Sequence, residues 1–295
     1  MSKVGFIGVG TMGCPMASNI VSKGNELNFY DPFVQAENKS KLENLGAKYC
    51  SSIKDLLDDR DFVITMLPNG NNVKDVCLGE EGLLKQEKKD YIHIDMSTIL
   101  PADSITINKE FELQKIKMFD APVARLVNNA IDGTLLILVG GDNDKFGEIK
   151  PLLETMGSDV VYCGNSGSGS KMKIINNYMS IVSNIVTAET LSLVEKSGID
   201  LNLAINLLTT TAAGKGHLNV SYPIKVLKND VSPGFKNTLA LKDLKLALEQ
   251  GSLDGIDLST GKSALKIYEG AEKTQYKDLD WTSMFNYVKE INKIG

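Results

Sequence analysis

The first half of the chain alternates short apolar runs with amphipathic stretches. Each run has the length and the β-branched or aromatic content of a buried strand, and the stretches between them have helical periodicity. The apolar runs are Lys3 to Val9, Leu27 to Tyr30, Phe62 to Leu67 and Tyr91 to Asp95, and two of the amphipathic stretches are Ile53 to Leu57 and Val73 to Leu84. This alternation predicts parallel strands joined by crossover helices, which is an α/β fold with a doubly wound parallel sheet.

The middle of the chain continues this pattern and then changes composition. Phe119 to Gly141 predicts a strand, a loop with a single arginine, a short helix and a very apolar strand that ends in Gly-Gly. Pro151 to Val161 predicts one more helix and strand. A Gly/Ser-rich run then follows Cys163 and predicts a domain boundary. The α/β domain is therefore expected to span residues 1–163.

After residue 165 the apolar positions follow helical spacing almost throughout. The predicted helices are Lys171 to Lys196, Leu201 to Thr210, Ser221 to Lys228, Leu239 to Gly251, Ser259 to Gly270 and Trp281 to Ile294. Thr209 to His217 is too polar and glycine-rich for a helix interior and predicts a loop. Residues 164–295 are therefore expected to form an all-α C-terminal domain.

The turn after the first apolar run carries a glycine fingerprint, Gly8-Val-Gly10-Thr-Met-Gly13, and a helical pattern follows it. In such a unit Gly8 permits the tight turn, Gly10 lets a pyrophosphate approach the backbone, and Gly13 lets the helix pack on the strand. The phosphates would lie at the positive helix N-terminus, beside Thr11 and Met12. The alternative is a glycine-rich turn without a ligand.

Asp31 strengthens the dinucleotide interpretation. It ends the second apolar run, at the distance from the fingerprint where an acidic residue binds the adenosine ribose hydroxyls. Asp31-Pro-Phe contains no lysine or arginine, and a carboxylate would repel a ribose 2′-phosphate. The sequence therefore predicts residues 1–163 to be an NAD-binding Rossmann domain, with NADH preferred over NADPH.

Polar or turn-forming residues follow the next two strands. Leu67 and Pro68 end one apolar run, and Ser97 and Thr98 follow the other. Ligands of doubly wound sheets bind at the carboxyl ends of the strands. We therefore expect Leu67, Pro68 and Thr98 to contact the cofactor and Ser97 to contact the substrate, with plain turn chemistry as the alternative.

The long helix that begins the second half carries one polar row. Lys173, Asn176, Asn177 and Ser180 have offsets of zero, three, four and seven, and such offsets share one face of a helix. Apolar residues occupy the other sides, which predicts a largely buried helix: Ile174, Ile175, Met179, Ile181 and Val182. A lysine on such a helix needs a functional or structural partner, because charged side chains are rarely buried alone.

Composition and charge narrow the class of protein. The chain has 295 residues, 42% of them hydrophobic and 23% charged, with a formal net charge of -5. Because the lysines are scattered among acids, a nucleic-acid partner is not expected. The longest aliphatic run, Leu135 to Val139, is too short to span a bilayer, and no signal peptide precedes the first strand, which favours the cytoplasm. Four widely spaced cysteines and two histidines indicate neither a metal site nor a disulfide framework.

Five ordered motifs together resemble the β-hydroxyacid dehydrogenase family. They are the glycine fingerprint, Asp95-x-Ser-Thr, Asp120-Ala-Pro-Val, Gly133-Thr-Leu and Gly167-x-Gly-x-x-x-Lys173-x-x-x-Asn177. The resemblance covers essentially the whole chain. It implies a Rossmann domain, a helical domain with the substrate site and oligomer contacts, Lys173 as the catalytic residue, Lys242 near the cofactor, and assembly as a homodimer or homotetramer.

One loop departs from the family pattern. Most of the family has Ser-Gly-Gly after Asp-Ala-Pro-Val, whereas this chain has Ala124-Arg125-Leu126. With its neighbouring motifs, this loop resembles the sulfolactaldehyde reductase branch, which reduces 3-sulfolactaldehyde to 2,3-dihydroxypropane-1-sulfonate with NADH. The likeness implies that Arg125, Asn176 and Ser180 hold the sulfonate. A surface arginine or an interdomain ion pair is the alternative for Arg125.

The expected chemistry is reduction of a carbonyl by NADH. An ammonium at Lys173 can stabilise the developing alkoxide and then protonate it, and Asn177 can orient Lys173 or the substrate oxygen. The alternative for Asn176 and Asn177 is hydrogen bonding between helices. The leading hypothesis is a reductase of a short anionic aldehyde. The alternatives are a carboxylate semialdehyde reductase that acts on succinic, methylmalonic or tartronic semialdehyde, and a catalytically silent dinucleotide-binding sensor.

Overall fold

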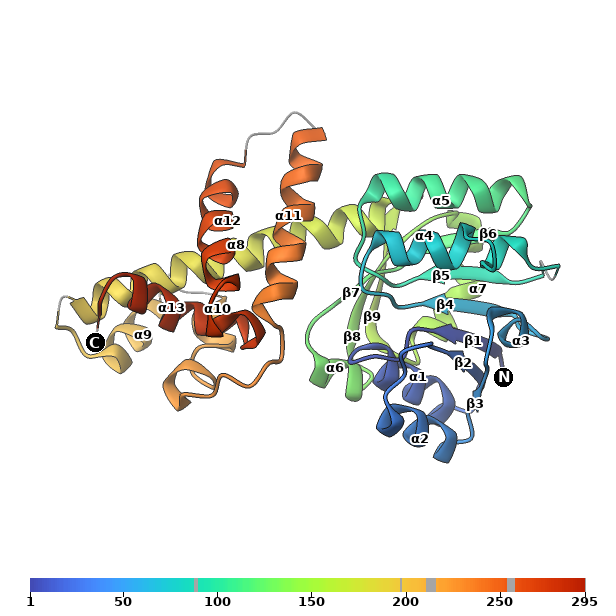
Figure 1. Cartoon of the computed structure of the whole chain (residues 1–295), viewed down its shortest axis with the longest axis horizontal. Helices are drawn as coiled ribbons and strands as arrows, with labels where there is room; N and C mark the ends of the chain where they lie inside the picture. Colours follow the sequence, from blue (N-terminus) through green and yellow to red (C-terminus); the bar gives the residue numbers. More distant parts are fainter. Residues whose placement is uncertain (88–89, 197, 211–215, 254–257, 295) are drawn as a thin grey trace. The chain divides into compact units, whose positions relative to one another are not determined.

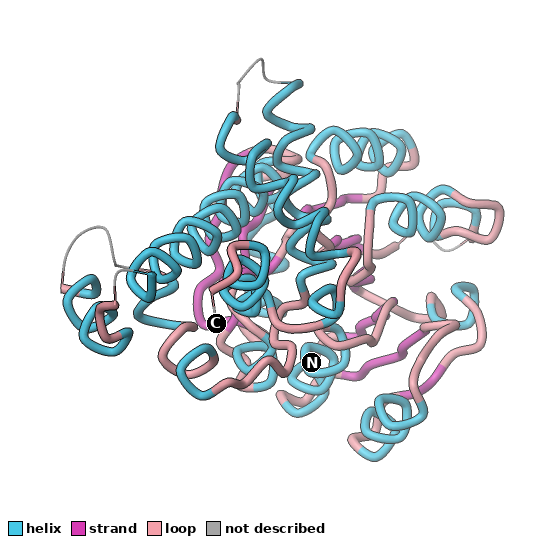
Figure 2. Tube along the Cα trace, turned by 60° about the vertical axis from the view of Figure 1, so that its left-hand side comes forward, coloured by secondary structure: helices cyan, strands magenta, loops and turns pink. Residues whose placement is uncertain are grey.

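The structure is a computed structural model that describes residues 1–87, 90–196, 198–210, 216–253 and 258–294. The chain divides into two compact units, Met1–Lys173 and Ile174–Gly295. All strands of the described residues belong to the first unit (Figure 2). In the described part of the chain, no helix has both the length and the apolar content to cross a bilayer.

The first unit is a Rossmann domain. Its sheet has the strand order β3-β2-β1-β4-β5-β6-β8-β7, and β9 pairs with β8. The strands are β1 (Lys3–Ile7), β2 (Glu26–Tyr30), β3 (Lys48–Tyr49), β4 (Phe62–Thr65), β5 (Ile92–Asp95), β6 (Lys117–Asp120), β7 (Val123–Ala124), β8 (Leu135–Gly140) and β9 (Gly157–Gly164). Strands β1 to β6 pair in parallel, whereas β8 is antiparallel to β6 and β7. The predicted α/β class with a doubly wound parallel sheet is therefore confirmed.

Helices cover both faces of this sheet (Figure 1). They are α1 (Gly13–Ser22), α2 (Ala36–Asn44), α3 (Ile53–Leu56), α4 (Gly70–Leu78), α5 (Pro101–Leu113), α6 (Val127–Ile131), α7 (Asn143–Leu153) and the short 3-10 helix η1 (Leu83–Lys85). Adjacent residues of β1, Phe6 and Ile7, belong to the two separate apolar cores on either side of the sheet. A parallel strand that is buried on both faces needs such a continuous apolar run.

The second unit is all-α. Its elements are α8 (Ser168–Lys196), α9 (Leu201–Thr209), α10 (His217–Val220), α11 (Asn237–Leu253), α12 (Ser259–Glu272), α13 (Met284–Ile291) and the 3-10 helices η3 (Val226–Lys228), η4 (Gln275–Asp278) and η5 (Trp281–Ser283). Helix α8 begins in the first unit and continues into the second. The helical C-terminal part that the apolar spacing predicts is thus present.

Two details of the predicted helices are wrong. The segment Ser221 to Lys228 forms turns and η3 rather than one helix, because Pro223 cannot donate a backbone hydrogen bond and disfavours helical geometry before it. Ile175 and Met179 of α8 are 60% and 73% exposed, so this helix is not apolar and buried on all its other sides. The predicted loop before His217 includes residues 211–215, which lie outside the described residues.

Candidate active site

The loop between β1 and α1 depends on two of its three glycines for its backbone path. Gly8 has φ +92°, and a side chain there would collide with the carbonyl of Met66 after β4. A Cβ on Gly13 would collide with the carbonyl of Gly8. Only glycine therefore allows this tight turn and the close packing of α1 on β1.

Gly10 is different, because no described protein atom lies within 4 Å of a Cβ built on it. The protein itself leaves room for a side chain at this exposed position. No described side chain caps α1, and its first turn carries no acidic residue. A helix N-terminus with open space beside it fits a dinucleotide pyrophosphate, and a side chain at Gly10 would fill that space.

Asp31 lies beside this loop at the carboxyl end of β2. Its carboxylate accepts hydrogen bonds from the backbone N–H of Val9 at 2.9 Å and of Phe33 at 2.8 Å. The residues from 32 to 38 contain no lysine or arginine, and Lys39 places its Nζ 3.8 Å from the centre of the Tyr49 ring. The acid is therefore held in one position without a neighbouring cation in this loop.

Ser97 joins the loops that follow β4 and β5. Its hydroxyl donates to Asp95 Oδ1 at 2.6 Å and accepts from the backbone N–H of Leu67 at 2.9 Å. Ser97 is 1% exposed. Its hydroxyl positions Leu67 in this structure, and direct contact between Ser97 and substrate stays a prediction.

A neutral histidine supports the same loops from within the sheet. Thr65 donates to Asp95 Oδ1 at 2.8 Å, so its hydroxyl accepts from His93 Nε2 at 3.0 Å. Burial lowers the pKa of His93 to about 3 and raises the pKa of Asp95 to about 6. His93 also stacks on Phe111, with 4.7 Å between the ring centres, so it is a core residue.

The remaining predicted cofactor residues of the first unit lie at the same edge of the sheet. Thr11 and Pro68 are exposed, and Met12, Leu67 and Thr98 are half-buried. They occupy the loops that follow β1, β4 and β5, whose carboxyl ends adjoin in the parallel sheet. The structure therefore brings the first-unit cofactor set together, as a doubly wound sheet requires.

Asp120 holds the first turn of α8. This carboxylate is 1% exposed and accepts from the backbone N–H of Gly167 and of Ser170, both at 2.7 Å. Burial raises the pKa of Asp120, although these hydrogen bonds favour its charged form. A Cβ on Gly169 would collide with the carbonyl of Leu138, so a glycine is needed for this close approach. This contact ties the start of α8 to the first unit.

Asp120 has no predicted role, although it is part of the Asp-Ala-Pro-Val motif. Lys173 lies one helical turn after Ser170, so the carboxylate acts on the helix end that carries this lysine. The domain boundary expected after residue 163 lies ten residues before the end of the first compact unit at Lys173. The hydrogen bonds from Gly167 and Ser170 to Asp120 account for this extension.

Asp120→Asn is expected to lower the free energy of unfolding by about 1–3 kcal/mol, because an amide nitrogen would then face a backbone donor. Turnover should fall as the first turn of α8 loosens. Chemical denaturation and steady-state kinetics measure both effects. Asp142→Asn is the matched control, since this half-buried acid pairs with Lys117 and caps α7 through the N–H of Asp144, a cap that asparagine can also provide. Equal stability of the two variants would contradict the role of Asp120.

The polar row of α8 is engaged on its buried side. Asn177 is 7% exposed, its Nδ2 donates to Asp243 Oδ2 of α11, and its Oδ1 accepts from Asn176 Nδ2 at 3.2 Å. Lys173 is half-buried. Lys242 of α11 lies 3.0 Å from Asp243 Oδ1. The buried Asp243 carboxylate therefore contacts both Asn177 and Lys242, and Asn176 is linked to it through Asn177.

Ser180 and His217 form a second contact in this unit. Ser180 is half-buried, and its backbone carbonyl accepts from His217 Nε2. Burial lowers the pKa of His217, and its ring lies edge-on to Trp281 at 4.7 Å. These contacts give His217 a structural role in the helical unit. Lys215 lies outside the described residues.

Arg125 lies in the first unit and adopts a left-handed backbone with φ +80°. Its Nη1 donates to the carbonyl of Thr134 at 2.6 Å and to Ser158 Oγ at 2.8 Å, and its Nη2 donates to Asp159 Oδ2 at 2.6 Å. The hydrogen bond from Ser158 and then Arg125 lower the pKa of Asp159. A bound anion would have to share this guanidinium with Asp159.

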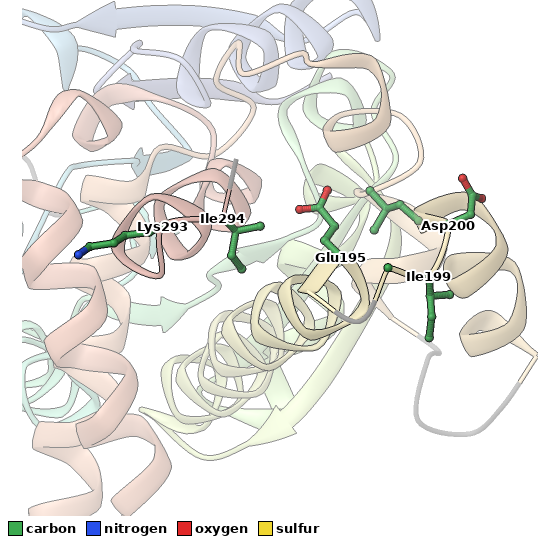
Figure 3. A pocket seen from close by; sticks show the side chains of 7 residues that line it. Glu195, Ile199, Asp200, Lys293 and Ile294 are labelled. Carbon is green, nitrogen blue, oxygen red and sulfur yellow. The ribbon is translucent and has the colours of Figure 1, made fainter.

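A cavity of about 660 Å³ lies elsewhere in the second unit (Figure 3). Its lining includes Glu195, Ile199, Asp200, Lys293 and Ile294, and none of the predicted site residues. It therefore adds nothing to the predicted site. Among the described residues, no group of three or more His, Cys, Asp or Glu side chains is placed to hold a metal ion.

Comparison with known proteins shows which family this architecture represents. Residues 3–164 match the model of the NAD binding domain of 6-phosphogluconate dehydrogenase. Residues 167–288 match the model described as NAD-binding of NADP-dependent 3-hydroxyisobutyrate dehydrogenase. The two models thus cover both units.

Individual relatives are similar over nearly the whole chain. The 3-sulfolactaldehyde reductase of Escherichia coli (strain K12) is 38% identical over 98% of this chain and 96% of its own. The mitochondrial 3-hydroxyisobutyrate dehydrogenase of Mus musculus is 36% identical over 97% of this chain and 87% of its own. The solved 3-hydroxyisobutyrate dehydrogenase of Mycobacterium tuberculosis with L-serine has a TM-score of 0.89 at 29% identity, and covers 98% of this chain and 99% of its own. The chain therefore belongs to the β-hydroxyacid dehydrogenase family and is an NAD(P)-dependent oxidoreductase that acts on CH–OH groups.

Proposed function

We propose that this enzyme reduces 3-sulfolactaldehyde to 2,3-dihydroxypropane-1-sulfonate with NADH. The observation that carries the proposal is the 38% identity, over 98% of the chain, to a 3-sulfolactaldehyde reductase. Arg125 supports an anionic substrate, because a guanidinium offers paired donors that suit a sulfonate or a carboxylate. The deciding experiment compares kcat/KM for 3-sulfolactaldehyde and for carboxylate semialdehydes, and a higher value for the carboxylates would overturn the proposal.

In the proposed reaction, bound NADH supplies a hydride to the carbonyl carbon. The ammonium of Lys173 stabilises the negative charge that develops on the carbonyl oxygen and then protonates it. The glycine loop and Asp31 hold the dinucleotide, and the family resemblance implies that Lys242 also contacts it. Arg125, Asn176 and Ser180 seat the sulfonate, and Arg125 gives up part of its contact with Asp159 when the anion binds.

Asp31 is expected to set the preference for NADH. Asp31→Asn keeps an acceptor oxygen for one of the two backbone N–H groups, those of Val9 and Phe33, and removes the charge that would repel a 2′-phosphate. The ratio of kcat/KM for NADH to that for NADPH should fall by about tenfold. Glu37→Gln, on the first turn of α2, is the control and should leave the ratio unchanged. An unchanged ratio in Asp31→Asn would remove the basis of the cofactor proposal.

A carboxylate substrate is the second candidate within the same chemistry. The 36% identity to a mouse 3-hydroxyisobutyrate dehydrogenase favours it. Arginine binds a carboxylate as readily as a sulfonate, so Arg125 does not separate the two. The comparison of kcat/KM for 3-sulfolactaldehyde and for carboxylate semialdehydes separates the two substrate classes. A dinucleotide-binding sensor without activity would instead bind NADH and turn over none of these aldehydes.

Assembly and cellular location stay predictions. Met172, Ile175 and Met179 are exposed apolar side chains on one face of α8, which supports the expected homodimer or homotetramer. The expected cytoplasmic location rests on the sequence, as does the expectation of a small anionic aldehyde or alcohol as substrate and of neither nucleic acid nor membrane as a partner.

A further inference from the structure

The side-chain amide of Asn177 is held on both of its ends. Its Nδ2 donates to Asp243 Oδ2, and its Oδ1 accepts from Asn176 Nδ2 at 3.2 Å. A carboxylate can only accept hydrogen bonds, so it selects the nitrogen of the amide and turns the oxygen away. The amide of Asn177 therefore has one favoured orientation.

Asp243 is itself fixed in place. It is 4% exposed and lies on α11, and its second oxygen lies 3.0 Å from Lys242 Nζ. Leu241 and Leu244 on either side of it belong to the same apolar core as Ile181 of α8. Packing of the two helices therefore fixes the distance between Asp243 and Asn177.

A reversed amide would be strongly disfavoured. Its oxygen would then face the Asp243 carboxylate, and a buried charge-assisted hydrogen bond would be replaced by repulsion. The reversed orientation should be rarer by roughly tenfold or more. The Asn177 oxygen therefore points to the side of Asn176, on the helix face that also carries Lys173 one turn earlier.

We propose that Asp243 is a positioning residue, which makes Asn177 a hydrogen-bond acceptor on the Lys173 face of α8. In this arrangement Asn177 accepts from the Lys173 ammonium or from the hydroxyl of the product alcohol, and it does not donate to the substrate carbonyl. Lys173 alone then supplies the proton. This inference rests on the proposed function only in taking Lys173 as the proton donor.

The pH dependence of reduction follows from this geometry. An acceptor beside an ammonium favours its protonated form, which is the form that reduction needs. Activity should therefore persist to a higher pH with the acceptor present than without it. The charged groups of the two helices that bear on this pH dependence are Asp243 and Lys242 of α11 and Lys173 of α8.

Asp243→Asn tests the proposal, because an amide at position 243 allows the side-chain amide of Asn177 to adopt the reversed orientation. We expect kcat for reduction to fall by about tenfold and the alkaline limb of its pH profile to move down by about one unit. The dissociation constant for NADH should change less than threefold. Asp278→Asn, an exposed acid of η4 in the same unit, is the control and should behave as wild type.

The double variant Asn177→Asp/Asp243→Asn exchanges the two groups. A carboxylate at position 177 would accept from the new amide and still present an oxygen to the Lys173 face. It should therefore restore the alkaline limb to the wild-type position or above it. Thermal unfolding identifies variants that fail to fold. The pH profile of the folded double variant then shows whether an oxygen at position 177 on the Lys173 face sets the alkaline limb.

Two results would overturn the proposal. One is a folded Asp243→Asn enzyme with the wild-type kcat and pH profile. The other is a loss confined to NADH affinity, which would mean that Asp243 acts through Lys242. Any aldehyde that the wild type reduces can be used, so a wrong substrate assignment would not affect this test. A wrong role for Lys173 would instead appear in the Lys173 variants.

Discussion

Lys173→Ala is expected to lower kcat for aldehyde reduction by about 10³-fold, within the range of about 10² to 10⁴ that a positioned general acid contributes. The alkoxide that forms on hydride transfer would lose both its cationic partner and its proton donor. The affinity for NADH should stay near the wild-type value, because the groups proposed to hold NADH, the glycine loop and Asp31, do not include Lys173. Single-turnover kinetics and NADH fluorescence titration measure the two quantities.

Two controls make this result specific. Lys171→Ala removes an exposed lysine two positions earlier on the same helix and should leave turnover unchanged. Lys173→Arg keeps a positive charge but replaces the ammonium by a guanidinium, which does not release its proton near neutral pH. It should recover little activity. If Lys173→Ala kept more than about a tenth of the wild-type kcat, another group would have to be the acid.

Arg125→Gly is expected to lower kcat/KM for 3-sulfolactaldehyde by about 10²-fold, as the loss of paired charge-assisted hydrogen bonds implies. Activity on an uncharged short aldehyde should change little. Glycine fits this site without strain, because the backbone of Arg125 has φ +80°. The variant should therefore fold, and a loss of activity would report on the missing guanidinium. An unchanged rate with the sulfonated aldehyde would refute the anion assignment.

Asp159→Asn separates the two possible roles of Arg125. It weakens the ion pair while leaving the guanidinium in place. If Arg125 binds the substrate anion, this variant should lower KM for the sulfonated aldehyde, because a competing carboxylate is gone. If the ion pair only fixes the loop, Asp159→Asn and Arg125→Gly should both raise KM.

Much of the first unit could be predicted because its signals are local. The apolar runs and the glycine loop lie within short stretches of chain, and Gly8 and Gly13 have the steric roles that their spacing predicts. Asp31 directly follows β2, so its place at the carboxyl edge follows from the parallel order of β1 and β2. The predicted helix from Ser221 to Lys228 is wrong, because the preference of Pro223 for a turn outweighs the helical spacing of the apolar residues.

Other parts of the site depend on residues far apart in the chain. Asp120 lies 47 residues before Gly167, and Asn177 lies 66 residues before Asp243. Arg125 lies 34 residues before Asp159, with which it forms an ion pair. No periodicity in the sequence predicts these pairs, because the two residues of each pair come together only when strands and helices pack.

The sequence by itself determined the fold class, the dinucleotide loop and the row of polar residues on α8, since each follows from backbone geometry and side-chain spacing over a few turns. The tertiary structure decided how those residues are held. It placed Arg125 against Asp159, bound the first turn of α8 to Asp120, and turned the Asn177 amide toward Asp243. The physical reason is that a buried carboxylate must find donors, and only the packed fold shows which donors lie within reach.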